Sequence, residues 1–376
     1  MSSLQNSLKK SDKMFNSRSY GKWQQMLAQL LPDNCQSRLV NMTLLIVGIF
    51  SSRSVYLSVI ARKIPLRVQK WSIAKRFERF LDNDAVDVER WYHPWATWLI
   101  QSASAGGVLH LVIDTTKVSA KYRLLMVGVA YQRRTLPLMW EWVAYPRGHC
   151  PATLQLALLK RLKALIGTEI EVSFVGDSEF GNVAVISLLN QWGWQYSLRQ
   201  KGRTLYQQAH HDGWQRIDSI PIERGQCLWL GNIRLTQAKA CLTHLVIYWK
   251  RGEKEPWYLA TNCLSGLPCI QLYKRRVWIE EMFGDMKGHG FDLELSRLRM
   301  PERLSRLTLA VCILYVWLVT TGEYVLQHDL NGEVDRKTRR DLSIFRLGWD
   351  WLERRFVFDD PIPILFRPNF CLVSGC

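Results

Sequence analysis

The spacing of apolar and polar positions divides the chain into helical and strand-like parts. Apolar residues recur with a helical period through the first hundred residues, and runs typical of strands begin near residue 107. From there the order is three strands, a helix, a strand, a helix and a strand, which predicts a mixed sheet covered by helices. The predicted strands are 108–114, 123–132, 135–144, 169–177 and 194–200, and the helices are 151–166 and 183–193.

A second group of short apolar runs, separated by glycines, follows the last of these strands. It occupies residues 201–262 and includes the strand-like runs 227–235 and 241–249, so it predicts a β-rich insertion. A helix over 273–287 comes next. This order is that of a ribonuclease H-like core, in which the 273–287 helix is the closing element.

The first part of the chain predicts a separate basic unit. Residues 1–81 carry 14 Lys and Arg against 3 Asp and Glu. Helical periods over 54–64 and 70–81, joined by a turn at Pro65, outline a helix-turn-helix, a motif that places its second helix in the DNA major groove. A basic helical hairpin without that role has the same pattern. The candidate DNA contacts on the second helix are Lys75, Arg76 and Arg79.

We therefore expect an α/β protein of three domains. Residues 1–104 form a helical, basic DNA-binding domain, and residues 105–325 form the ribonuclease H-like mixed sheet with its insertion at about 201–262. The tail, 326–376, contains an amphipathic helix over 341–356, and dimerisation is a candidate role for it.

The amino-acid composition limits the kinds of molecule that this protein is expected to bind. Fifty Lys and Arg against 33 Asp and Glu give a net charge of +17, which favours a polyanion, nucleic acid before a membrane surface. The nine cysteines include no C-x-x-C pair, which argues against a zinc knuckle or disulfide framework and fits a reducing cytoplasm. The polar N-terminus does not resemble a signal peptide. The most apolar runs, 41–50 and 307–322, are short for a membrane span and predict core helices.

The 273–287 helix combines charge with large apolar side chains. At 100° per residue, Tyr273, Arg276, Glu280 and Lys287 fall on one stripe about 60° wide. A carboxylate among cations suggests a site, although a solvated face with i,i+4 ion pairs has the same pattern. The apolar residues fall on a separate flank and are predicted to be buried: Trp278, Ile279, Met282, Phe283 and Met286.

Acidic residues follow two of the predicted strands directly. Asp114 ends the run LVID, and Asp177 follows SFVG; either acid alone could cap a turn. Together with Glu280 they supply three carboxylates, enough to hold two Mg²⁺ ions for in-line phosphoryl transfer. Glu179 is a further candidate for the metal shell. Glu281 differs from Glu280 by about 100° around the helix, which argues against it as the third ligand.

These motifs are similar to those of the DDE transposases of bacterial insertion sequences. The spacing Tyr273-(2)-Arg276-(3)-Glu280-(6)-Lys287 resembles the Tyr–Arg–Glu–Lys signature of one subgroup, and GHGFDLELSRLRMPERLSR resembles its continuation. IDTT and VGDSEFGN resemble the two aspartate motifs of the family. The likeness covers about 105–325, with a β-type insertion as in that subgroup, while the N-terminal unit matches only in kind.

The resemblance implies a DNA transposase that binds the ends of its insertion sequence. Asp114, Asp177 and Glu280 would bind two Mg²⁺, with Mn²⁺ as a substitute, and catalyse strand cleavage and strand transfer by cut-and-paste through a hairpin. Tyr273, Arg276 and Lys287 would hold the DNA backbone. Trp257 occupies the place of a tryptophan that stacks on a flipped base, with Trp229 and Trp249 as other candidates, and core packing as the alternative.

The resemblance also implies the partners and the compartment. Expected partners are terminal inverted repeats, target DNA and a second copy of the chain on DNA, in the bacterial cytoplasm and nucleoid; no membrane or small-molecule substrate is expected. Two other functions remain open at this point. One is a metal-dependent nuclease without strand joining, and the other is a non-catalytic regulator that occupies the ends, which the intact triad of acids disfavours.

Overall fold

The computed structural model describes residues 20–144, 150–208, 213–337, 339–358 and 360–370. The chain forms two compact units, each built from segments distant in sequence. The first unit contains Met1–Ser102 and Phe283–Asn369, and the second contains Ala103–Met282 and Phe370–Cys376. The predicted division into three domains stays a prediction.

The second unit contains a ten-stranded mixed sheet with the order β3-β2-β1-β4-β5-β10-β9-β8-β6-β7. Its first five strands have the order and directions of the predicted core, because β1 pairs in parallel with β4, β4 pairs in parallel with β5, and β2 and β3 are antiparallel. The predicted fold class is confirmed. The strands are β1 (Leu109–Lys117), β2 (Arg123–Tyr131), β3 (Arg134–Val143), β4 (Val172–Gly176), β5 (Gln195–Arg199), β6 (Leu205–Gln207), β7 (Gln215–Arg216), β8 (Cys227–Leu235), β9 (Cys241–Tyr248) and β10 (Trp257–Thr261).

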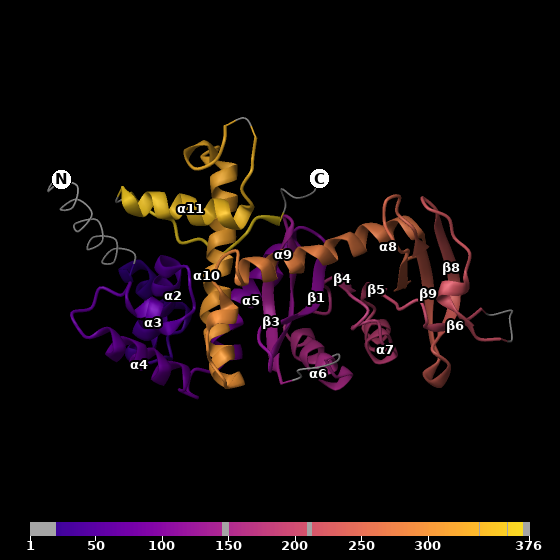
Figure 1. Ribbon diagram of the computed structural model, residues 1–376, viewed down its shortest axis with the longest axis horizontal. Coiled ribbons are helices and arrows are strands. Elements are labelled where there is room, and N and C mark those ends of the chain that lie inside the picture. The colour runs from indigo at the N-terminus through magenta and orange to yellow at the C-terminus, as the bar shows by residue number, and fades with distance from the viewer. Residues whose placement is uncertain (1–19, 145–149, 209–212, 338, 359, 371–376) are drawn as a thin grey trace. The chain divides into compact units, whose positions relative to one another are not determined.

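The central strands form because both faces are covered. Every residue of β4 is buried, and β2 is buried over all but its first residue, as expected for apolar runs with helices on both sides. Figure 1 shows α6 (Ala152–Lys163) and α7 (Val183–Gln191) on one side of the sheet and α8 (Gly266–Tyr273) on the other. Asn182 begins α7 by accepting a hydrogen bond from the backbone N–H of Val185.

The β-rich insertion continues this sheet rather than forming a second one. β10 is antiparallel to β5 on one side and to β9 on the other. Strands β8 and β9 form a long antiparallel pair that is interrupted by a register shift between Leu230 and Ile233. The predicted insertion is therefore hydrogen-bonded directly to the core.

The predicted 273–287 helix is divided into two. Helix α8 ends at Tyr273, a 3₁₀ turn occupies Lys274–Arg276, and α9 spans Val277–Met286. In 3₁₀ geometry residues i and i+3 eclipse one another, so the turn brings Tyr273 and Arg276 closer together around the axis than a continuous α-helix would. The predicted apolar flank is buried at Ile279, Met282, Phe283 and Met286, whereas Trp278 is partly exposed.

The first unit is helical. Residues 20–30 are helical. Trp317 lies near its centre, with Trp23 edge-on at a ring-centroid distance of 5.0 Å and Phe50 at 5.8 Å. The remaining helices are α2 (Gln36–Ser52), α3 (Leu57–Ala61), α4 (Lys70–Leu81), α5 (Val88–Ala105), α10 (Pro301–Gln327) and α11 (Ile344–Val357), and both α5 and α9 continue from one unit into the other.

Helix α10 is apolar along most of its length. Among the described residues it is the one helix long and apolar enough to cross a membrane by length and composition, and 89% of its most apolar window is buried inside the structure. Pro301 suits its first turn because that position needs no N–H donor. The burial fits the core helix predicted from the 307–322 run.

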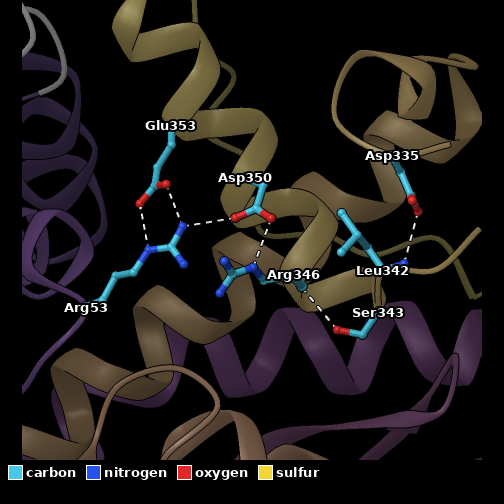
Figure 2. A network of polar contacts seen from close by, with 7 residues as sticks. All are labelled: Arg53, Asp335, Leu342, Ser343, Arg346, Asp350 and Glu353. Atoms are coloured by element: carbon cyan, nitrogen blue, oxygen red, sulfur yellow. Dashed lines mark hydrogen bonds and ion pairs between the residues drawn. The ribbon is translucent and has the colours of Figure 1, made fainter.

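A polar network joins α2 to α11 within this unit (Figure 2). Arg53 ends α2 in the left-handed conformation, with φ of 51°. Its guanidinium binds Glu353 through two nitrogens and Asp350 at 2.9 Å, and Asp350 also accepts a hydrogen bond from Arg346 at 2.9 Å. Ser343 caps the start of α11 by accepting from the backbone N–H of Arg346. The C-terminal helix is thus bound to the N-terminal helices.

Candidate active site

The first two predicted acids follow matched positions on neighbouring parallel strands. Ile113 of β1 is in register with Gly176, the last residue of β4, so Asp114 and Asp177 come next at the same level of the sheet. The predicted strand end at residue 114 is wrong, because β1 continues through Asp114 to Lys117 and stays paired with β2 there. Parallel strands in register bring their carboxyl ends to the same edge of a sheet. The apolar runs that precede the two acids therefore place the two carboxylates side by side.

Asp114 is buried, with a relative exposure of 8%. Burial raises its pKa to about 7, and repulsion from Asp177 and Glu280 acts in the same direction. The Arg276 guanidinium and the backbone N–H of Thr115 oppose that shift. The three predicted acids therefore interact electrostatically within the second unit.

Arg276 connects the first acid to the third. Its Nη1 donates to Oδ2 of Asp114 at 3.3 Å, and its Nη2 donates to Oε1 of Glu280, one helical turn further along. The Arg276 side chain is 19% exposed, and that of Glu280 is 49% exposed. Because Arg276 contacts a buried acid of the sheet, this part of the predicted stripe is not a solvated surface of i,i+4 pairs.

Tyr273 is buried at 3% exposure, so it is not on an open surface. Burial raises the pKa of its hydroxyl, while Arg276 and Arg199 lower it and Asp177 raises it further. Its ring contacts half-buried Trp257 edge-on, with centroids 5.1 Å apart. Tyr273 is thus electrostatically coupled to Asp177 and Arg276, and Trp257 packs against Tyr273.

Lys287 follows α9 and belongs to the first unit, where its Nζ pairs with Glu294 at 3.0 Å.

The other two candidate tryptophans lie in the insertion. Trp229 is 40% exposed, and its indole N–H donates to the carbonyl of Cys263 at 3.1 Å. Trp249 carries the Arg224 guanidinium over its ring at 5.5 Å.

The remaining acids of the region have other partners. Glu281 pairs with buried Arg134 at 3.2 Å, away from the Arg276–Glu280 pair, as its helical angle predicted. Glu179 accepts from the hydroxyl of Thr115 at 2.6 Å and from the backbone N–H of Cys150. Glu280 is therefore the acid of this helix that shares a cation with Asp114.

Sequence reasoning missed two residues. Arg199, the last residue of β5, lowers the pKa of Tyr273; its signal was a cation at the end of an apolar run. Trp71, in the first turn of α4, is 64% exposed although it is a large aromatic residue. An exposed tryptophan beside lysines could have been identified from the helical period.

The predicted basic residues of α4 differ in exposure. Lys75 and Arg79 are exposed, and Lys75 pairs with Glu78 at 2.7 Å. Arg76 is half-buried and donates to the side chain of Asn41. Trp71, Lys75 and Arg79 are four residues apart and so share one face of the helix.

The donor chemistry at the sheet edge suits Mg²⁺. Carboxylate oxygens are its preferred ligands, and a divalent cation would relieve the repulsion that raises the pKa of Asp114. In the part of the chain that the structure describes, no three Asp, Glu, His or Cys side chains converge into a complete metal site. Arg276 balances part of the negative charge in this conformation.

Comparison with known proteins identifies the family. The model of the family described as "Transposase DDE domain" matches residues 109–317, which include Asp114, Asp177 and Glu280. Among solved structures, a piggyBac transposase in a synaptic complex with hairpin DNA is 11% identical, with 97% of this chain and 84% of that chain covered and a TM-score of 0.43. No curated protein matches. The family match spans more than half of the 376 residues, so this chain belongs to the DDE transposases.

Proposed function

We propose that this transposase binds the terminal inverted repeats of its insertion sequence and catalyses metal-dependent strand cleavage and strand transfer by cut-and-paste. The observation that carries the proposal is the parallel register that sets Asp114 beside Asp177, with Arg276 joining Asp114 to Glu280. The three acids would supply the oxygen donors of the site. This arrangement suits phosphoryl transfer, which requires positioning and charge neutralisation.

Asp114, Asp177 and Glu280 would hold two Mg²⁺ ions, or Mn²⁺ in their place. The ions, when bound, would activate the attacking oxygen and stabilise the leaving oxygen. The chain would position the ligands through the parallel register of β1 and β4 and through the contacts of Arg276 with Asp114 and Glu280. Arg276 also offers a planar donor group to a DNA phosphate.

Two further residues of the predicted stripe, Tyr273 and Lys287, would hold the DNA backbone. Trp257 would stack on a base flipped out during hairpin formation. The edge-on contact of half-buried Trp257 with Tyr273, whose hydroxyl is coupled to Asp177, supports this role. Arg199 is a further candidate phosphate contact.

End recognition is assigned to α4. Its exposed face carries Trp71, Lys75 and Arg79, and the turn before it exposes Arg62 and Arg67. Basic side chains contact phosphates without regard to sequence, whereas an aromatic side chain contacts base edges or thymine methyl groups. We assign Lys75 and Arg79 to backbone contacts and Trp71 to specificity, while Arg76 is the weaker candidate because it binds Asn41.

The proposal includes assembly and location. Two copies would act together on paired ends, in the bacterial cytoplasm and at the nucleoid, with DNA as donor and target.

Purified protein should be incubated with DNA carrying its own element ends, with and without Mg²⁺, and both strands should be sized. Strand-transfer products support the proposal; cleavage alone supports a nuclease, and end binding without cleavage supports a regulator.

A further inference from the structure

Glu179 lies at the centre of a hydrogen-bond network beside the triad. Its Oε2 accepts from the hydroxyl of Thr115 at 2.6 Å, and Thr115 is the neighbour of Asp114 in the chain. Its Oε1 accepts from the backbone N–H of Cys150, just before α6. Its own backbone N–H donates to Oδ1 of Asp177 at 2.8 Å. One residue therefore contacts both segments that carry the two aspartates.

Two side-chain amides, those of Gln155 and Asn182, donate to the backbone carbonyl of Glu179. Gln155 of α6 is fully buried, and its Nε2 donates to the carbonyl oxygens of Cys150 and Glu179 at 3.1 and 3.2 Å. Its Oε1 accepts from Nδ2 of Asn182 at 2.8 Å. Asn182 in turn caps α7. The turn after β4, the start of α6 and the end of β1 are thus fixed to one another through Glu179.

The hydrogen bonds of Glu179 favour a supporting role over that of a metal ligand. Both oxygens of its carboxylate accept hydrogen bonds, from the Thr115 hydroxyl and the Cys150 N–H, so its charge is directed into the network. Residues that support metal ligands in this way are known to affect metal affinity strongly, because they fix the orientation of the ligands.

We infer that Glu179 is a positioning residue that holds Asp114 and Asp177 at a fixed separation for metal binding. The inference rests on the proposed function, since it assumes that the two aspartates bind metal. Glu179→Ala removes both acceptors and leaves the Cys150 N–H and the Thr115 hydroxyl without partners. Glu179→Gln preserves the network, because the amide oxygen can accept from Cys150 while the amide nitrogen donates to the rotatable Thr115 hydroxyl.

The test measures Mn²⁺ affinity of the full-length protein without DNA, by electron paramagnetic resonance of the free ion, with Mg²⁺-dependent cleavage in parallel. Glu179→Ala should bind Mn²⁺ about 10–100-fold more weakly than the parent, and Glu179→Gln should bind like the parent. Thr115→Val, which loses the hydroxyl at constant shape, should also bind more weakly, and Thr115→Ser should restore affinity. If Glu179→Ala does not fold, Thr115→Val is the variant that tests the inference.

The outcomes separate this inference from the proposed function. If Glu179→Gln loses Mn²⁺ binding as fully as Asp177→Asn, Glu179 is a ligand and the inference is overturned. Parent-like affinity in both Glu179→Ala and Thr115→Val also overturns it, provided that Asp177→Asn still loses the ion. If Asp114→Asn and Asp177→Asn bind Mn²⁺ like the parent, the metal site of the proposed function fails, and the positioning role fails with it.

Discussion

Arg276 and Asp114 are 162 residues apart in sequence, and the guanidinium of one donates to the carboxylate of the other at 3.3 Å. The contact joins the 3₁₀ turn between α8 and α9 to the end of β1. It supplies a positive charge to an acid that burial otherwise keeps from ionising easily. The same guanidinium binds Glu280, so a single arginine fixes the relative positions of two predicted metal ligands.

Replacing one triad acid by its amide should abolish cleavage while end binding persists. Asp114→Asn, Asp177→Asn and Glu280→Gln each remove a ligand charge at constant shape. Sizing of both DNA strands in Mg²⁺ and a gel-shift assay test the two halves of the prediction. Glu281→Gln is the matched control on the same helix, because Glu281 pairs with Arg134. Parent-like nicking by Glu280→Gln would remove Glu280 from the site.

Asp114 should make stability fall as the pH rises from about 4 to about 7 in the absence of metal. Its pKa is about 7 in the folded protein and 3.8 in the ordinary unfolded case. Within that window the folded state holds a proton that the unfolded state has lost, so the free energy of unfolding decreases with pH. Asp114→Asn lacks this contribution. Thermal melts of both proteins should therefore differ in slope between pH 4.5 and 7, and parallel curves would contradict the raised pKa.

Arg276→Ala should affect DNA binding, whereas Met282→Ala should affect the stability of the core. Arg276→Ala should weaken DNA binding and reduce the slope of log affinity against log salt by about one. Met282 is fully buried, so Met282→Ala should cost about 2–5 kcal/mol of unfolding free energy and leave the salt slope unchanged. DNA titrations at several salt concentrations, beside urea unfolding, test both. The opposite assignment of the two effects would mean that Arg276 serves only the fold.

The exposed face of α4 should combine general and specific DNA contacts. Lys75→Ala and Arg79→Ala should weaken end DNA and scrambled DNA alike and reduce the salt slope by about one each. Trp71→Ala should lower the preference for end DNA by about 1–3 kcal/mol, with the slope unchanged. Competition binding measures that ratio. Arg90 is exposed on α5 and pairs with Asp33, so Arg90→Ala is the control that should leave binding unchanged.

Point substitutions are needed here because deletion of residues 1–81 would remove more than a DNA contact. Trp23 and Phe50 pack on Trp317 of α10. A deletion would expose that core to water. Loss of end binding by a truncated protein would therefore not identify a recognition surface.

Arg53→Ala should destabilise the first unit by about 1–3 kcal/mol. The side chain is one-third exposed and binds both Asp350 and Glu353, so its contacts are worth more than those of a fully exposed pair (Figure 2). Arg336→Ala is the control, because Arg336 is 73% exposed and pairs only at the surface with Asp341. It should cost less than about 1 kcal/mol. Equal effects in urea unfolding would show that the Arg53 network is not a structural link.

The spacing of apolar and polar residues predicted the helices and strands of this fold better than it predicted the contacts between distant residues. The apolar runs before Asp114 and Asp177 predicted both strands and the end of β4, because a strand is encoded within a few neighbouring positions. The end predicted for the first strand at residue 114 was wrong, since β1 continues to Lys117. The 3₁₀ turn at Lys274–Arg276 was missed, since its side chains fit an α-helix equally well. The contact of Glu179 with Thr115 was missed because it joins residues 64 positions apart, and a helical or strand period carries no information on such a pair.

The pairing of β10 with β5 has a mechanical consequence. Leu259, Ala260 and Thr261 are in register with Arg199, Leu198 and Ser197, so the insertion and the core belong to one continuous elastic body. A hinge between them would have to break main-chain hydrogen bonds in the middle of a sheet. Deformation of this unit by bound DNA should therefore appear as twisting spread over many strands.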